Sequence, residues 1–139
     1  MHVRQAIDDV LKNLRRYPVK GGIAHAFNGS MQQAEAVIEL GFKLGFGGAM
    51  TYSRATHIQA LAKTLPIESI VLETDAPDIP PSWLGHGKRN APHELHQIAT
   101  FFANLRDMNL DSVIEVSYQN TLDALPKIVQ LCTSAKNLQ

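Results

Sequence analysis

Two short apolar runs of this sequence end in residues that could do chemistry. In the stretch IVLETDAPDIPP, residues 70–81, the apolar run leads directly into Glu73 and Asp75, and His25 follows the run GGIA. Imidazole nitrogens and carboxylate oxygens are ligands that Zn²⁺ and Mn²⁺ accept in proteins. A metal or acid–base site is therefore expected if the fold brings these strand ends together.

Each of these residues also has a structural interpretation. An aspartate before Ala-Pro often caps the following turn, and a lone histidine on a strand is more often a satisfied core residue than a ligand. The apolar strand in front of Asp75 favours a functional role for that carboxylate. For Glu73 two roles stay open, a hydrogen bond that supports the site and direct participation.

The elements that must position these residues alternate along the chain. Sequence periodicity and capping signals predict helices over 4–16, 30–41, 58–65 and 92–106 and from an N-cap at Asp111 to about 125, with strands over 21–27, 42–48 and 69–75. Strands separated by crossover helices pair in parallel. Ligands of parallel sheets bind at the carboxyl ends of the strands, where His25 and Asp75 are expected. Side-chain alternation puts Glu73 on the same face as Asp75, one layer deeper.

The composition bounds the class of protein. The chain has 139 residues, 45% of them hydrophobic, and 13 basic residues balance 13 acidic ones. This predicts a single soluble domain. Its balanced charge creates no overall electrostatic attraction to nucleic acid, so any contact with a polyanion must be local. One cysteine and no apolar run of about 20 residues favour a cytoplasmic protein without a disulfide framework or membrane association.

Several segments together resemble the TatD family. These metal-dependent hydrolases have a (β/α)8 barrel and are commonly described as deoxyribonucleases. The resemblance extends to about Asn120, and in family order its segments are HVRQA (2–6), HAFNGS (25–30), GFKLGFGGAMTY (41–52), LETDAPDIP (72–80) and KRNAP (88–92).

The resemblance implies a site with two divalent metal ions, without distinguishing Zn, Mn and Mg. His2 and His25 would bind one ion, and Asp75 would bind the other and handle a proton of the attacking water. DNA would be the substrate. Asn28 departs from the serine common at this place in the family, which concerns the loop rather than the metals.

Four basic residues lie near the expected site, and each is either a phosphate contact or an ordinary solvated charge. They are Arg4, Arg54, Lys88 and Arg89. Arginine suits bidentate phosphate recognition. Trp83, in the loop before Lys88, either stacks on a base or packs the loop down.

A complete (β/α)8 barrel takes about 250 residues, roughly twice this chain. The resemblance therefore implies a partial barrel, the C-terminal half, without the family's first-strand histidine pair and central glutamate. The expectation is one truncated domain, residues 1–139, with little or no nuclease activity alone and with exposed sheet edges that favour self-association. Two alternatives remain: a non-catalytic half-barrel that only pairs with itself or with a missing N-terminal half, and a hydrolase acting on another ester or amide.

Overall fold

A computed structural model of the chain describes residues 6–127. Helices and strands alternate as far as Leu72, and after a long loop two further α-helices follow. In chain order the elements are α1 (Ile7–Arg16), β1 (Gly22–Ala24), α2 (Met31–Glu39), β2 (Phe42–Phe46), the short 3-10 helix η1 (Gly48–Thr51), α3 (Thr56–Thr64), η2 (Ile67–Ser69), β3 (Ile70–Leu72), η3 (Pro92–Glu94), α4 (Leu95–Arg106) and α5 (Leu110–Ala124).

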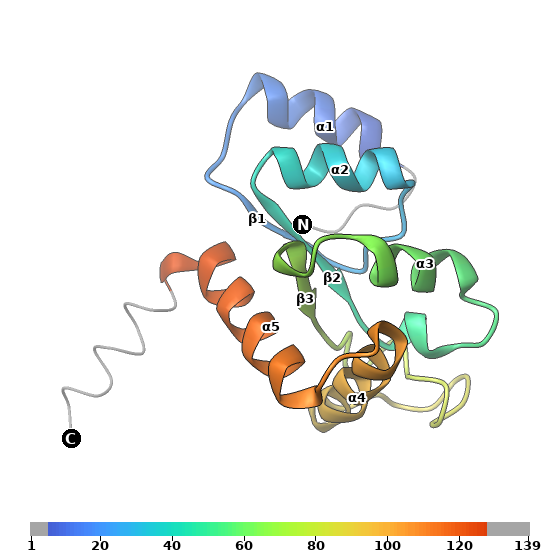
Figure 1. Ribbon diagram of the computed structural model, residues 1–139. Helices are drawn as coiled ribbons and strands as arrows, with labels where there is room; N and C mark the ends of the chain where they lie inside the picture. Colours follow the sequence, from blue (N-terminus) through green and yellow to red (C-terminus); the bar gives the residue numbers. More distant parts are fainter. Residues whose placement is uncertain (1–5, 128–139) are drawn as a thin grey trace.

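The three strands form one parallel sheet in the order β1-β2-β3 (Figure 1). The predicted parallel α/β architecture is confirmed. The strands are shorter than predicted. After β1, Ala26 adopts a left-handed conformation with φ 49°, and the Phe27 N–H beyond it still donates to the Gly45 carbonyl of β2 at 3.1 Å. After β3, Glu73 continues the pairing, since its N–H donates to the Phe46 carbonyl at 3.1 Å.

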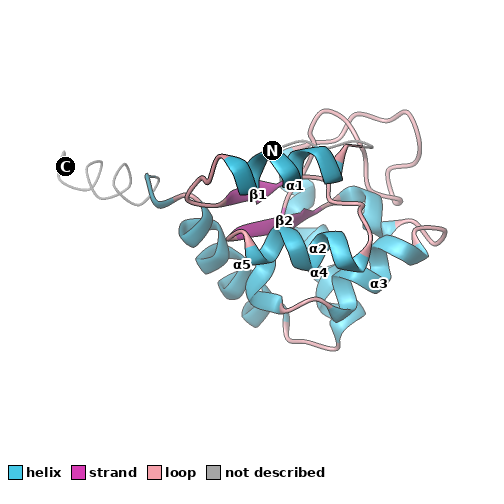
Figure 2. Cartoon of the chain, turned by 90° about the horizontal axis from the view of Figure 1, so that it is seen from above, coloured by secondary structure: helices cyan, strands magenta, loops and turns pink. Residues whose placement is uncertain are grey.

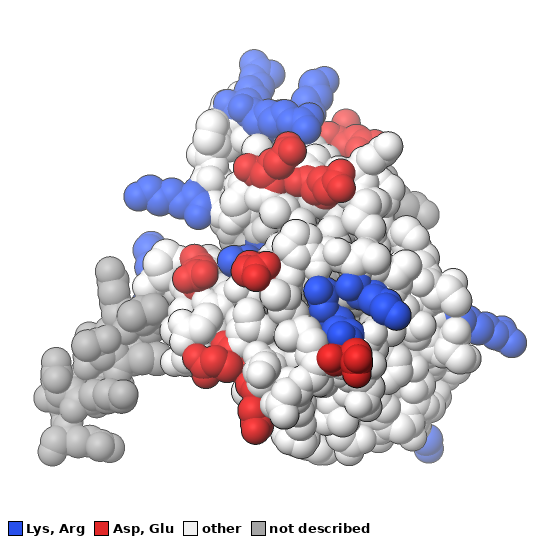
Figure 3. Space-filling view, viewed as in Figure 1, with Lys and Arg blue, Asp and Glu red and all other residues white. Residues whose placement is uncertain are grey.

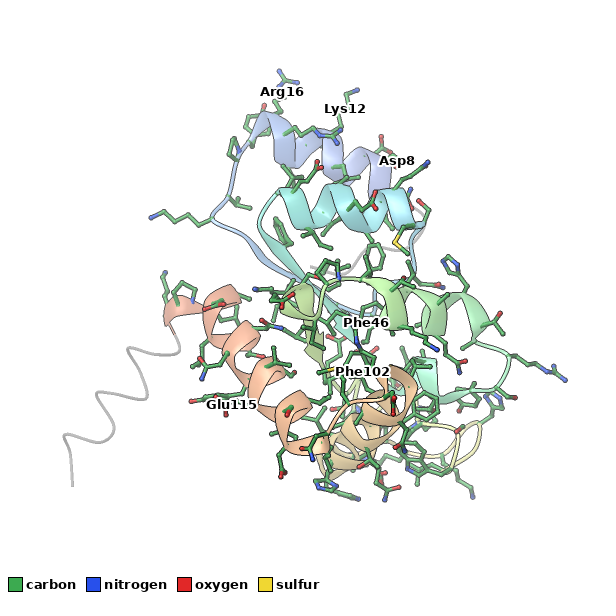
Figure 4. All side chains as sticks on the ribbon, viewed as in Figure 1. Asp8, Lys12, Arg16, Phe46, Phe102 and Glu115 are labelled. Carbon is green, nitrogen blue, oxygen red and sulfur yellow. The ribbon has the colours of Figure 1, made fainter. Side chains whose placement is uncertain are left out.

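The hydrophobic core lies between the sheet and the helices: α2 to α5 gather on one side of the strands in Figure 2, and α1 adds Leu11 to the core. Alternate residues of β2 point into this core, and Phe46 meets the region of Phe102 from α4 near the centre of the molecule (Figure 4). Gly45 points to the opposite face because side chains alternate along a strand. The sheet thus has a packed face and a second face on which the candidate site lies.

Side-chain caps begin two of the helices, α2 and α5. Ser30 and Gln33 form the predicted capping box at the start of α2. The predicted N-cap Asp111 is wrong. Asn109 caps α5, because its side-chain oxygen accepts hydrogen bonds from the N–H groups of Asp111 and Ser112, and Asp111 occupies the first turn. A carboxylate there still stabilises the helix N-terminus.

Helix α5 covers the outer edge of β3. Ser117 Oγ accepts the Leu72 N–H at 2.9 Å, and Asn120 Nδ2 donates to the carbonyls of Ile67 and Ile70 at 2.8 and 2.7 Å. The expectation of an unpaired edge is therefore wrong for β3. Side chains of the final helix satisfy backbone groups that another strand would otherwise pair with.

Replacing Asn120 with alanine should lower the free energy of unfolding by about 1–3 kcal/mol, the cost of leaving a buried polar group unsatisfied. Asn120 is only 3% exposed and serves two carbonyls, so its loss cannot be repaired by water without opening the edge. Urea denaturation measures the change. Gln119→Ala, an exposed neighbour on the same helix, is the matched control and should stay within about 0.5 kcal/mol of the wild type.

The loop between β3 and α4 is tied down at several points. Asn90 is 2% exposed, and its side chain donates to the carbonyls of Asp78 and Ile79. Trp83 Nε1 donates to buried Glu94 at 2.6 Å, which supports the loop-packing interpretation of this tryptophan. No helix among residues 6–127 is long and apolar enough to cross a membrane.

Candidate active site

His25 and Asp75 meet at the carboxyl end of the sheet. His25 follows β1, Asp75 follows β3, and the distance from His25 Nδ1 to Asp75 Oδ1 is 3.1 Å. Both side chains are partly open, at 30% and 21% exposure, so a ligand can reach them. The parallel topology brings these two residues together across 50 positions of sequence, as the strand-end argument predicted.

The turn after Asp75 is not closed by the aspartate side chain. The Asp75 backbone carbonyl accepts the Asp78 N–H at 2.6 Å, while the carboxylate faces His25. The carboxylate is thus available to a ligand rather than used as a turn cap.

Glu73 lies deeper and connects the ends of all three strands. Its Oε1 accepts the Ala26 N–H at 2.5 Å and lies 3.2 Å from His25 Nδ1. The left-handed backbone of Ala26 is unfavourable for a residue with a side chain. The hydrogen bond to Glu73 helps hold it, and so fixes the residue directly after His25.

Two glycines in and directly after β2, Gly45 and Gly47, leave room for Glu73. A Cβ atom at Gly45 would overlap the Glu73 carboxylate, with Oε1 only 2.7 Å away, and one at Gly47 would lie 2.7 Å from the Glu73 carbonyl oxygen. These glycines therefore let the carboxylate cross beneath the end of β2 toward Ala26.

Burial raises the pKa of Glu73 above its ordinary value of 4.5, opposed by the Ala26 hydrogen bond and by His25. A raised pKa in the folded state means that protonation stabilises the fold, and this contribution is lost as pH rises through that pKa. The free energy of unfolding of the wild type should therefore fall, relative to Glu73→Gln, as pH rises above the ordinary pKa of a glutamate and through the raised pKa of Glu73. Glutamine retains an acceptor for Ala26. Urea titrations of both proteins test this, and a pH-independent difference would contradict it.

An open groove of about 890 Å³ lies beside this cluster. Its lining includes Ala26 and Gly45, which both contact Glu73, and it extends past the N-terminal turn of α1 to His57 on α3. His57 Nε2 lies 2.9 Å from the Gly29 carbonyl oxygen, and both residues line the groove.

The donor types at this cluster suit a divalent metal, since one imidazole and two carboxylates converge. The number of donors does not complete a site. Among residues 6–127, no group of three or more His, Cys, Asp or Glu side chains is arranged to hold a metal ion. The same ring nitrogen of His25 faces both carboxylates, and Glu73 is already engaged by Ala26.

The remaining predicted residues are more scattered. His2 and Arg4 lie outside the described residues. Arg54 is exposed just after η1, and Lys88 and Arg89 are exposed on the loop before α4. This loop segment passes close to the chain after Asp75, because the next residue, Asn90, donates its backbone N–H to the Pro77 carbonyl.

The sequence matches the family model of TatD related DNases over residues 1–126. The chain belongs to the TatD family. It is 35% identical over 122 residues to YjjV of Escherichia coli K12, named an uncharacterized metal-dependent hydrolase, covering 87% of this chain and 47% of the relative. A TATDN1 homolog of Enterocytozoon bieneusi, named as a candidate deoxyribonuclease, is 31% identical over 137 residues, covering 92% and 48%.

The crystal structure of YjjV agrees with the TatD fold of this chain. It superposes with a TM-score of 0.83 at 35% identity and covers 88% of this chain and 48% of that one. The chain thus spans about half the length of the TatD relatives it matches. The predicted family and the partial-barrel fold class are confirmed.

Proposed function

We propose that this TatD-family chain takes part in metal-dependent hydrolysis of phosphodiester bonds, with DNA as the substrate. The observation that carries the proposal is the 3.1 Å approach of His25 and Asp75 beside an open groove, in a family described as related to DNases. A nuclease site needs groups that bind a metal and a group that takes up a proton, and this pair supplies both types.

In this proposal His25 and Asp75 are metal ligands, and His2 is a further ligand from outside the described residues. A divalent ion bound there would supply charge neutralisation for the phosphate and acidify water. The Asp75 carboxylate accepts the proton that the attacking water releases. Glu73 keeps His25 in place through Ala26 rather than touching the substrate.

The substrate phosphates are proposed to contact basic residues at the groove's rim rather than a broad basic surface. The face of the molecule in Figure 3 carries interleaved basic and acidic side chains. Lys88 and Arg89, on the loop tied to residues after Asp75, are the proposed contacts, together with Arg54 and, from outside the described residues, Arg4.

The test is cleavage of bis(p-nitrophenyl) phosphate and of a labelled DNA oligonucleotide after removal of bound metals and addition of Mn²⁺. Because the described donors are incomplete, the expected rate is slow, and the decisive comparison is between the wild type and His25→Ala. The proposal predicts Mn²⁺-dependent cleavage that the variant reduces at least about 100-fold. Equal rates for both proteins would contradict it.

The incomplete donor set favours one alternative, a non-catalytic half-barrel that acts by association. That alternative predicts no cleavage above background in the same assay at any Mn²⁺ concentration. Light scattering would then show a stable oligomer.

A further inference from the structure

A stacked pair of aromatic rings lies at the tip of the loop between β3 and α4. The rings of Tyr52 and His86 have centroids 4.7 Å apart and an interplanar angle of 21°. The two residues are 34 positions apart, so the fold builds this pair and no local sequence signal identifies it.

Tyr52 is a rigid base for the pair. Its hydroxyl donates to the Pro80 carbonyl at 2.9 Å, and its own carbonyl accepts the Gln59 side chain at 3.1 Å. Two residues close in sequence to this contact line the groove: Met50, two positions before Tyr52, and Ile79, directly before Pro80. Through the bond to Pro80, Tyr52 joins the stacked pair to the segment that lines the groove of the candidate active site.

His86 is the open member of the pair. It is exposed and lies between Gly85 and Gly87, which have φ angles of 82° and 74°. A Cβ atom at either glycine would meet no other described atom within 4 Å. The loop around His86 is therefore open on these two sides, and the exposed ring of His86 can be reached by a flat group.

The charge around this tip suits a polyanion. Residues 79–93 contain no aspartate or glutamate, and Lys88 and Arg89 follow His86 directly after Gly87. An aromatic platform beside flexible cations is the arrangement with which proteins hold bases and phosphates of an unpaired strand.

We propose that His86, supported by Tyr52, is a stacking platform for an unpaired base of a nucleic-acid strand that enters the groove. This inference rests on the proposed function, because it names how the same substrate is held. Lys88 and Arg89 contact the neighbouring phosphates, and the base stacks on the exposed face of His86.

Binding can be tested apart from cleavage by working in excess chelator. Trp83, the only tryptophan, is 39% exposed in the same loop, and its fluorescence can report binding. The probes are a thymidine oligonucleotide of about ten residues and an abasic oligomer with the same number of phosphates. The wild type should bind the thymidine probe about tenfold more tightly, since stacking distinguishes two probes of equal charge.

In His86→Ala the ratio of the affinities for the thymidine and abasic probes should fall to about one, while His86→Phe should retain the tenfold preference. Lys88→Ala should weaken the binding of both probes by a similar factor. His96→Ala, which replaces an exposed histidine on α4, is the matched control. Circular dichroism confirms that each variant is folded. Equal binding of both probes by the wild type, no binding of either, or an unchanged preference in His86→Ala would overturn the inference.

The two proposals fail in different ways. Mn²⁺-dependent cleavage of bis(p-nitrophenyl) phosphate without any base preference would overturn the stacking platform and leave the proposed hydrolysis intact. Base preference in chelator without cleavage would support the platform and contradict the hydrolysis.

Discussion

Asp75→Asn should weaken the binding of Mn²⁺ or Zn²⁺ by about 10–100-fold or more. Losing even a residue that only supports a metal ligand typically costs 10–100-fold in affinity, and Asp75 is proposed as a ligand itself. Asparagine keeps the size of the side chain and removes the negative charge that lies 3.1 Å from His25 Nδ1. The effect should therefore appear in metal affinity with little change in the metal-free fold.

Isothermal titration of the metal-free protein measures this affinity, and thermal unfolding with and without metal checks it independently. Asp78→Asn is the matched control. Asp78 is an exposed aspartate in the same turn, and its N–H closes the turn through the Asp75 backbone carbonyl. The control should bind metal as the wild type does. Equal losses in both variants would mean that general negative charge, rather than the Asp75 carboxylate, attracts the ion.

Gly45→Ala should destabilise the protein by about 1–3 kcal/mol, the usual cost of overpacking a close-packed position. The added methyl group would overlap the Glu73 carboxylate, which is held between Gly45 and the Ala26 N–H. Glu73 must then move, and the Ala26 hydrogen bond breaks. The strand end that carries His25 should lose its fixed position, so metal affinity should fall along with stability.

A double-mutant cycle tests whether Glu73 is the cause. Glu73→Ala removes the group that the new methyl would strike, so Gly45→Ala should cost less in that background. The coupling free energy should reach about 1 kcal/mol, within the range found for residues in contact. Denaturation in urea gives all four stabilities. Additive effects would mean that the methyl group at position 45 disturbs something other than Glu73.

The sequence predicted the helices, the parallel pairing and the meeting of His25 with Asp75, because each depends on short-range patterns or on a rule of parallel topology. Apolar periodicity marks the helices, and crossover connections put both residues at the same end of the sheet. These parts of the structure needed no knowledge of side-chain packing.

The missed features depend on contacts between distant segments. The fit of Glu73 over Gly45 joins two strands, and the stack of Tyr52 on His86 joins two loops. Neither leaves a periodic signal in the sequence. The N-cap of α5 was misplaced for a local reason, since Asn109 and Asp111 are both good caps and only the backbone geometry separates them.

The ends of β1 and β3 are proposed to bind a divalent metal together. The most direct test is elemental analysis of the purified chain, with light scattering of the same samples, for the wild type and the double variant His25→Ala/Asp75→Asn. We expect about one or more transition-metal ions per wild-type chain in a defined oligomer, and a metal-free variant that forms an oligomer of the same mass. A wild type that holds no more metal than the double variant would contradict it.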